Sequence, residues 1–148
     1  MKEAIVAAAN VRRFSRDALE QLPPALLVAD AHRLLSLTRS TGYRLLREGM
    51  YPCAVVRVGD QYRVVTAALL RVLGLDDSSV RHRIAVLPPA IRLSVANELL
   101  SISRSTGYRL ARTGQYPCDV LQLGAEYRVR KAELQRFLLV NDAPAVAA

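Results

Sequence analysis

One stretch of this sequence occurs twice. The seven residues RSTGYRL run from Arg39 to Leu45, and the same seven run from Arg104 to Leu110, 65 positions later. The repeat extends well beyond this core, because residues 22–75 align with residues 87–140 without a gap and 29 of the 54 aligned positions are identical. Two copies of so long a unit do not make a solenoid of short stacked repeats. The sequence therefore predicts a tandem pair of small domains.

The positive charge of the chain lies on the repeated units. Each copy carries a formal charge of +4 within a net charge of +8, and 19 of the 21 basic residues are Arg. This distribution is expected if each unit binds the same kind of polyanion. Arg is well suited to bidentate contacts with phosphate or guanine. A genome rich in G and C, which favours Arg and Ala codons, explains the Arg excess equally well.

The repeat also sets the predicted domain boundaries. The sequence predicts a helical segment over 1–21, copy one over 22–75, a linker over 76–86, copy two over 87–140 and a flexible tail over 141–148. Each copy is near the lower length limit for an independent core. We therefore expect the copies to pack on each other or on the N-terminal helical segment.

The first half of each copy is predicted to hold two helices. Ser94 is a candidate N-cap for the first helix of copy two, and apolar residues follow it at helical spacing. Thr38 and Ser103 are candidate N-caps of the second helices, which we expect to end at Gly49 and Gly114.

The second half of each copy is predicted to hold a β-hairpin and a third helix. Residues 55–58 and 62–64 are rich in β-branched side chains and surround a turn that contains glycine, and residues 120–129 repeat this pattern. Thr66 is a candidate N-cap for a helix over 67–73, with 131–138 as its counterpart. The predicted class is mainly α with small β-hairpins, in the order of a winged helix-turn-helix.

The second helix of each copy is predicted to present a polar, cationic face. At about 100° per residue, Gly42, Leu45 and Leu46 share the side that faces the first helix. The opposite side and the flanks carry Arg39, Ser40, Thr41, Tyr43, Arg44 and Arg47 in copy one, and Arg104, Ser105, Thr106, Tyr108, Arg109 and Arg112 in copy two. Such a helix suits the major groove of DNA, where Arg pairs with guanine and hydroxyl groups reach phosphates or base edges. The alternative is an ordinary solvated face, which has no physical need to match between two copies that differ elsewhere.

These landmarks resemble the excisionase-type, MerR-like winged helix-turn-helix family. The resemblance rests on RSTGYRL, then Gly-x-Tyr-Pro-Cys, Gly-x-x-Tyr-Arg-Val and Ala-x-Leu in order in both copies. It implies two tandem winged helix-turn-helix domains, with the second helix in the major groove and the hairpin on the phosphate backbone or in the minor groove. The implied wing contacts are Tyr62 and Arg63, Tyr127 and Arg128, with Arg57 and Arg130 as contacts particular to one copy. Tyr62 and Tyr127 fit a role as core aromatic residues equally well.

Two features depart from the pattern of this family. Gly42 and Gly107 stand where the family usually has a bulkier residue. Since Gly inside a helix costs about 1 kcal/mol relative to Ala, we expect close packing at both positions. Asp60 and Glu126 lie close to the tips of the hairpins, where the family tends to be basic, and acidic tips are disfavoured in a minor groove.

The cysteine and histidine residues do not suggest a disulfide or a metal site. Cys53 and Cys118 occupy equivalent positions, so neither copy has a partner thiol of its own. The histidines, His32 and His82, do not stand at ligand spacing to either Cys. We expect each Cys to be a small buried hydrophobe and expect no cofactor. The sequence shows no nucleophile–base pair or phosphate loop, so we do not expect an enzyme.

The apolar segments are short. The sequence holds no run of the roughly 20 apolar residues that a membrane span needs. The apolar run over 4–9 is too short for one, and Glu3 fits a secretory signal poorly. These features favour a cytoplasmic, nucleoid-associated protein that has no membrane partner.

The predicted function is sequence-specific binding of double-stranded DNA, most simply by a transcription regulator that reads two adjacent half-sites. The 76–86 linker spans at most about 36–40 Å when extended, and half-sites one helical turn apart lie about 34–36 Å from each other. One alternative is an excisionase, or recombination directionality factor, with a recombinase as its partner. Another is an antitoxin or adaptor that binds a protein partner. The operator, the direction of regulation and the oligomeric state stay open.

Overall fold

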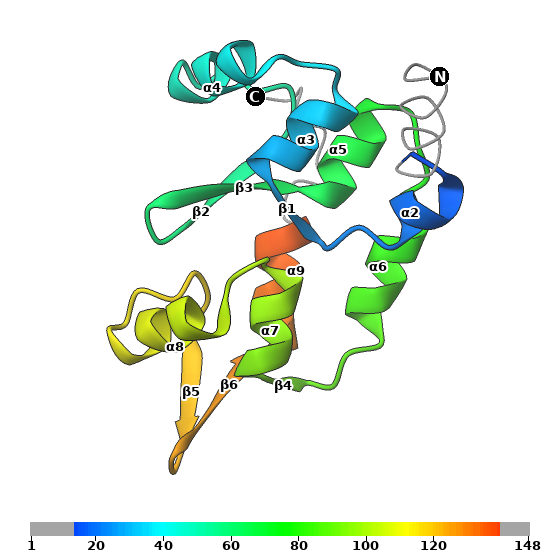
Figure 1. Cartoon of the computed structure of the whole chain (residues 1–148). Helices are drawn as coiled ribbons and strands as arrows, with labels where there is room; N and C mark the ends of the chain where they lie inside the picture. Colours follow the sequence, from blue (N-terminus) through cyan, green and yellow to red (C-terminus); the bar gives the residue numbers. More distant parts are fainter. Residues whose placement is uncertain (1–13, 140–148) are drawn as a thin grey trace, which may run out of the picture.

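The computed structural model describes residues 14–139, which form eight helices and two three-stranded antiparallel sheets (Figure 1). Copy one contains β1 (Ala25–Leu27), α3 (Val28–Leu34), α4 (Arg39–Arg47), β2 (Val55–Val58), β3 (Gln61–Val65) and α5 (Thr66–Val72). Copy two contains β4 (Ala90–Arg92), α7 (Leu93–Leu99), α8 (Arg104–Arg112), β5 (Val120–Leu123), β6 (Glu126–Arg130) and α9 (Lys131–Leu139). Helix α2 (Arg16–Glu20) precedes copy one, and α6 (Ser78–Ala85) connects the copies.

The boundaries of the second helices agree with the prediction. The side chains of Thr38 and Ser103 cap α4 and α8, each accepting a hydrogen bond of 3.3 Å from the backbone N–H three residues later. After each helix the chain turns through a glycine in the left-handed region, at Gly49 (φ 68°) and Gly114 (φ 73°). A side chain would be strained in that conformation, so these glycines end the helices.

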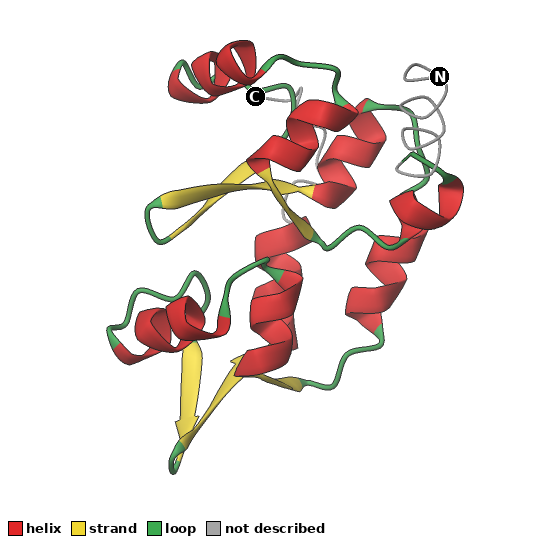
Figure 2. Cartoon of the chain, viewed as in Figure 1, coloured by secondary structure: helices red, strands yellow, loops and turns green. Residues whose placement is uncertain are grey.

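A short strand before the first helix of each copy was not predicted. Strands β1 and β4 each pair with the second strand of the hairpin, giving the sheet orders β1-β3-β2 and β4-β6-β5 (Figure 2). Each strand runs directly into the helix, so the last residue of the strand takes the N-cap position. The assignment of Ser94 as an N-cap is therefore wrong, because Arg92 is the N-cap and Ser94 lies inside α7.

The assignment of Thr66 as an N-cap is also wrong. Thr66 is the first residue of α5 and is completely buried, with Val65 at the cap position. Its hydroxyl donates to the backbone carbonyl of Pro23. This hydrogen bond fastens the entry of β1 to the start of α5. The structure thus uses Thr66 for a contact between distant segments.

The segment between the copies is a helix. In α6, Val80 is 2% exposed and packs in the core of copy one, whereas Ile84 is fully buried in the core that lies mainly in copy two. The connector therefore stays well below the limit of about 36–40 Å that an extended 76–86 segment could reach, since the eight residues of α6 rise only about 12 Å. Of the predicted N-terminal helical segment only α2 falls within the described residues, and the 141–148 tail lies outside them.

The two copies pack directly against each other, as their small size predicts. Ala25 and Val58 of copy one are 0% and 4% exposed and belong to the hydrophobic core of copy two. Across the same junction the guanidinium of Arg63 donates to the carbonyl oxygens of Leu100, at 3.2 Å, and Ser101, at 2.8 Å. These carbonyls lie just after α7, where a positive charge is favourable for the helix dipole.

Candidate nucleic-acid interface

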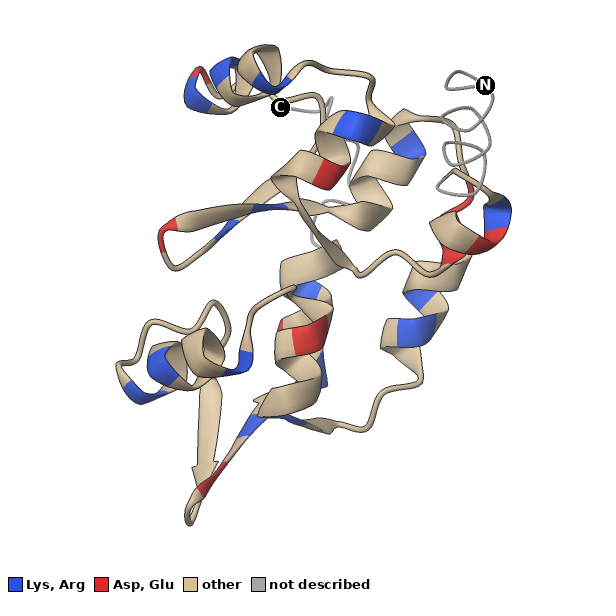
Figure 3. Cartoon of the chain, viewed as in Figure 1, with Lys and Arg blue, Asp and Glu red and all other residues tan. Residues whose placement is uncertain are grey.

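The cationic side chains predicted on the second helices are exposed. All six arginines on α4 and α8 are solvent-exposed, and none forms an ion pair within residues 14–139. Ser40 and Ser105 are exposed beside them, while Thr41 and Thr106 are half-buried. Figure 3 shows the basic residues along both helices. Each helix thus keeps its positive charge free for an external anion.

The aromatic side chains on these helices lie under arginines in the same way in both copies. The Arg39 guanidinium lies 5.7 Å from the ring centroid of Tyr43, and that of Arg104 lies 5.8 Å from the ring of Tyr108. Both distances fit a cation–π contact. A shallow hollow opens beside each pair, lined by Arg39, Ser40, Tyr43 and Arg47 in copy one and by Arg104, Ser105 and Tyr108 in copy two. The two helices therefore present the same local surface.

Close packing against the first helix sets the position of each second helix. A Cβ atom at Gly42 would overlap the imidazole of His32, which confirms the close packing expected there. His32 is 3% exposed, and its Nδ1 forms a 2.9 Å hydrogen bond with the Tyr51 hydroxyl. Burial holds the pKa of His32 below its ordinary value and raises the pKa of Tyr51.

Copy two uses the same arrangement with an amide in place of the imidazole. A Cβ atom at Gly107 would overlap the Asn97 side chain, and the Tyr116 hydroxyl donates to Asn97 Oδ1 at 2.8 Å. Sequence reasoning missed these supporting residues. The available signal was the conserved spacing between each Gly, the polar residue ten positions before it and the Tyr nine positions after it.

The hairpin of copy one packs beside the second helix of copy two. A Cβ atom at Gly59, at the hairpin tip, would lie 3.5 Å from Leu110 Cδ2 on α8. Arg57 and Asp60 of the hairpin line one hollow together with Arg109. Arg57 is exposed, with its guanidinium 5.5 Å from the ring centroid of Tyr62. This hairpin is thus part of the surface around α8.

The prediction that Arg63 contacts DNA is wrong. Arg63 is 6% exposed, and its guanidinium donates hydrogen bonds to the two backbone carbonyls that follow α7. Burial also lowers the pKa of Arg63. The equivalent residue, Arg128, is partly exposed and pairs with Glu126 at 3.1 Å. Identical residues in the two wings therefore have different roles.

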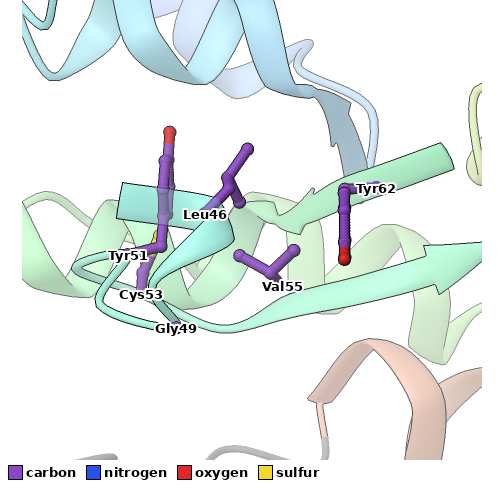
Figure 4. A pocket seen from close by; sticks show the side chains of 6 residues that line it. All are labelled: Leu46, Gly49, Tyr51, Cys53, Val55 and Tyr62. Atoms are coloured by element: carbon purple, nitrogen blue, oxygen red, sulfur yellow. The ribbon is translucent and has the colours of Figure 1, made fainter. Parts of the chain in front are cut away.

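The tyrosines of the hairpins also differ between the copies. Tyr62 is 40% exposed and lines a hollow between the end of α4 and the hairpin, together with Leu46 and Val55 (Figure 4). Tyr127 is half-buried against the core of copy two, with its ring centroid 6.3 Å from that of Tyr108. Tyr127 therefore supports the exposed face of α8, whereas Tyr62 is accessible.

The remaining predicted site residues have simple surroundings. Arg130 is exposed on β6. Cys53 and Cys118 are free thiols, each 7% exposed, as expected for small buried residues. Burial raises the pKa of each thiol to about 12, so neither is a reactive thiolate at neutral pH. Within residues 14–139, no three His, Cys, Asp or Glu side chains are grouped so that they could hold a metal ion.

Comparison of the chain with protein-family models, with curated proteins and with solved structures gave no match. Among the described helices, none combines the length and apolar character needed to cross a bilayer. Inference about function therefore depends on the geometry of the chain itself.

Proposed function

We propose that this protein binds double-stranded DNA in a sequence-specific manner through two tandem winged helix-turn-helix domains of the excisionase-type, MerR-like kind. In this proposal α3 with α4, and α7 with α8, are the helix-turn-helix pairs. The hairpins β2–β3 and β5–β6 are the wings. One observation carries the proposal: two equivalent nine-residue helices present the same exposed arginines, which lack ion-pair partners within the described residues.

The chemistry of this face suits a major groove. Arg44 and Arg109 lie near the middle of their helices, from where a guanidinium can make a bidentate contact with the O6 and N7 atoms of guanine. Arg47 and Arg112 lie one turn further on and are assigned to phosphates. The exposed hydroxyls of Ser40 and Ser105 stand at the helix starts, where the helix dipole also favours a phosphate.

The packing of the copies supports a fixed arrangement of two subsites. Because α6 and the Arg63 contact hold the copies together, the spacing between α4 and α8 does not depend on a flexible linker. In Figure 1 the hairpin of copy one extends between these two helices. A protein of this kind would recognise two similar motifs in one order and at one spacing, as a transcription regulator would.

Selection of bound sequences from random duplex DNA tests this proposal. The expected result is enrichment of two related motifs at a single spacing. On the enriched duplex, the double variant Arg44→Ala with Arg109→Ala should lose specific binding in a mobility-shift titration. The control is Arg33→Ala with Arg136→Ala, which removes the same charge from exposed positions outside α4 and α8. Absence of enrichment, or equal affinities of the two double variants, would overturn the proposal.

A further inference from the structure

We propose that molecules of this protein associate head to tail, repeating between chains the contact that joins the two copies within one chain. That contact joins two different surfaces. The donor face belongs to copy one and comprises Ala25, Val58, Gly59 and Arg63. The acceptor face belongs to copy two and comprises Leu100, Ser101, Ile102 and Leu110. The repeat gives each copy both faces, so each chain has one face of each kind that the described residues leave unused.

The unused donor face lies on copy two and is open to solvent. It comprises Ala90, Leu123, Gly124 and Arg128, each 65 positions after its buried counterpart. Leu123 is 55% exposed where Val58 is 4% exposed, and Ala90 is exposed where Ala25 is completely buried. An apolar pair that packs inside the chain is thus repeated on its surface.

Arg128 shares part of the local arrangement that Arg63 has. In both residues Nη1 donates to the carbonyl of the preceding tyrosine, at 2.9 Å for Arg128 and 3.0 Å for Arg63. Both guanidinium groups also donate a 3.1 Å hydrogen bond to the side chain two residues earlier, from Nη2 of Arg128 to Glu126 and from Nη1 of Arg63 to Gln61. Within residues 14–139, Nε of Arg128 has no acceptor, whereas Nε of Arg63 donates to copy two. Nε of Arg128 is therefore available for the first of these carbonyls, whereas its Nη2, which Arg63 uses for Ser101, has to exchange Glu126 for the second.

The unused acceptor face lies on copy one, at the end of α3. It comprises Leu35, Ser36, Leu37 and Leu45. Ser36 has a φ of 54° and Ser101 a φ of 56°, so both turns present their carbonyls with the same backbone geometry. No donor within the described residues reaches the carbonyl oxygens of Leu35 or Ser36.

The apolar part of this acceptor face is also unused. Leu37 and Leu45 are half-buried and do not belong to the core of copy one. Their counterparts, Ile102 and Leu110, are 7% and 2% exposed in the core at the junction. The difference arises because the donor face of copy one covers copy two, while no equivalent among residues 14–139 covers copy one.

The partner that fits both unused faces is a second copy of this chain. Six of their eight residues are identical to those at the junction within the molecule, and the other two are conservative exchanges, with Leu123 for Val58 and Leu37 for Ile102. Contact between chains lacks the tether that α6 provides, and a short tether corresponds to an effective concentration in the millimolar range. Association should therefore be weaker than the internal contact and should depend on protein concentration. This inference concerns the protein alone and does not rest on DNA binding.

Sedimentation velocity of the full chain without DNA tests the proposal. The average mass of the wild type should rise with concentration beyond that of two chains, because an open head-to-tail contact does not close at a dimer. Arg128→Glu removes the donor face and Leu45→Asp removes the acceptor face, so each variant alone should stay monomeric. Arg136→Glu is the charge control, since its side chain is 71% exposed outside both faces. This control should associate like the wild type.

Mixing the two blocked variants in equal amounts gives the sharpest result. The Leu45→Asp chain keeps a donor face and the Arg128→Glu chain keeps an acceptor face, so the mixture should form dimers and stop there. Thermal unfolding verifies that both variants are folded, and Leu37→Asp replaces Leu45→Asp if that variant is not. A wild type that stays monomeric up to about 1 mM, or a mixture of folded variants that stays monomeric, overturns the proposal.

Discussion

The guanidinium of Arg63 and the carbonyl oxygen of Ser101 lie 2.8 Å apart across the junction of the two copies. Arg128 is the same residue on the equivalent strand, and it contacts only its own hairpin within the described residues. Comparison of Arg63 with Arg128 therefore distinguishes the contacts that this arginine makes within its own hairpin from those that it makes across the junction.

Replacement of Arg63 by Ala should destabilise the protein by about 2–3 kcal/mol, because hydrogen bonds from a charged group to one buried and one partly buried carbonyl are lost. Arg128→Ala is the matched control and should cost less than about 0.5 kcal/mol. Urea denaturation measures both values. We also expect Arg63→Ala to broaden the transition as the copies lose coupling. Equal effects of the two substitutions would contradict the role of Arg63 at the junction.

Gly42→Ala should destabilise copy one by about 1–3 kcal/mol, since the new methyl group overlaps the His32 ring in a packed interior. Helix propensity alone predicts the opposite, a gain of about 1 kcal/mol. Removing the ring with His32→Ala should relieve the clash, so that Gly42→Ala costs little in that background. Ser40→Ala, on the exposed face of the same helix, is a control for substitution as such. A Gly42→Ala variant that is more stable than the wild type would contradict this prediction, because it would show that the His32 ring moves aside at little cost.

Stability should fall in mildly acidic solution because of His32. Burial lowers the pKa of this residue in the folded state below the ordinary value of 6.5, so the unfolded chain binds the proton first. Its effect on stability is absent above about pH 6.5 and grows as the pH falls towards the folded-state pKa, with a slope of at most about 1.4 kcal/mol per pH unit. Denaturation between about pH 5 and 7 should reveal it.

The matched variant for this pH effect is His32→Asn, which gives copy one the residue that copy two has at Asn97. There the amide accepts a hydrogen bond from Tyr116 and does not titrate. The variant should keep the fold and show a flatter stability profile between about pH 5 and 7. A wild type and variant with parallel profiles would mean that His32 is protonated without cost in the folded protein.

If the DNA-binding proposal is right, affinity for duplex DNA should fall steeply as salt increases, because bound cations are released from the phosphates. Arg47→Ala with Arg112→Ala should weaken binding by a similar factor for all sequences and should lower the salt slope by about 2. Fluorescence anisotropy at several salt concentrations measures this slope. An affinity that is the same at low and physiological salt would instead favour a protein partner.

The sequence predicted the elements that repeat with a regular period. The second helices were found because Thr38 and Ser103, and Gly49 and Gly114, mark the helix ends by local chemistry alone. The hairpins were found because runs of β-branched residues flank a turn that contains glycine. Strands β1 and β4 were missed because each has only three residues and no measurable alternation. Their existence depends on pairing with a hairpin strand 36 to 40 residues later, which no local pattern reports.

The surroundings of individual site residues were harder to predict. Identical residues in a repeat invite identical roles, and this reasoning placed Arg63 on DNA together with Arg128. Arg63 is buried because its side of copy one packs against copy two. The same side of copy two has no such neighbour among the described residues, so Arg128 stays partly exposed. Exposure of the arginines on α4 and α8 followed from helical periodicity, which does not depend on how the copies are arranged.

The helical form of the 76–86 connector makes its length part of the architecture. Each residue added within α6 would rotate everything after it by about 100° and shift it by about 1.5 Å. Val80 and Ile84 anchor this helix in the two cores, so such an insertion would pull one anchor out of register. Tandem proteins with loose tethers can change the gap between their modules by small insertions and deletions. Here the gap can change only if the interface between the modules is rebuilt.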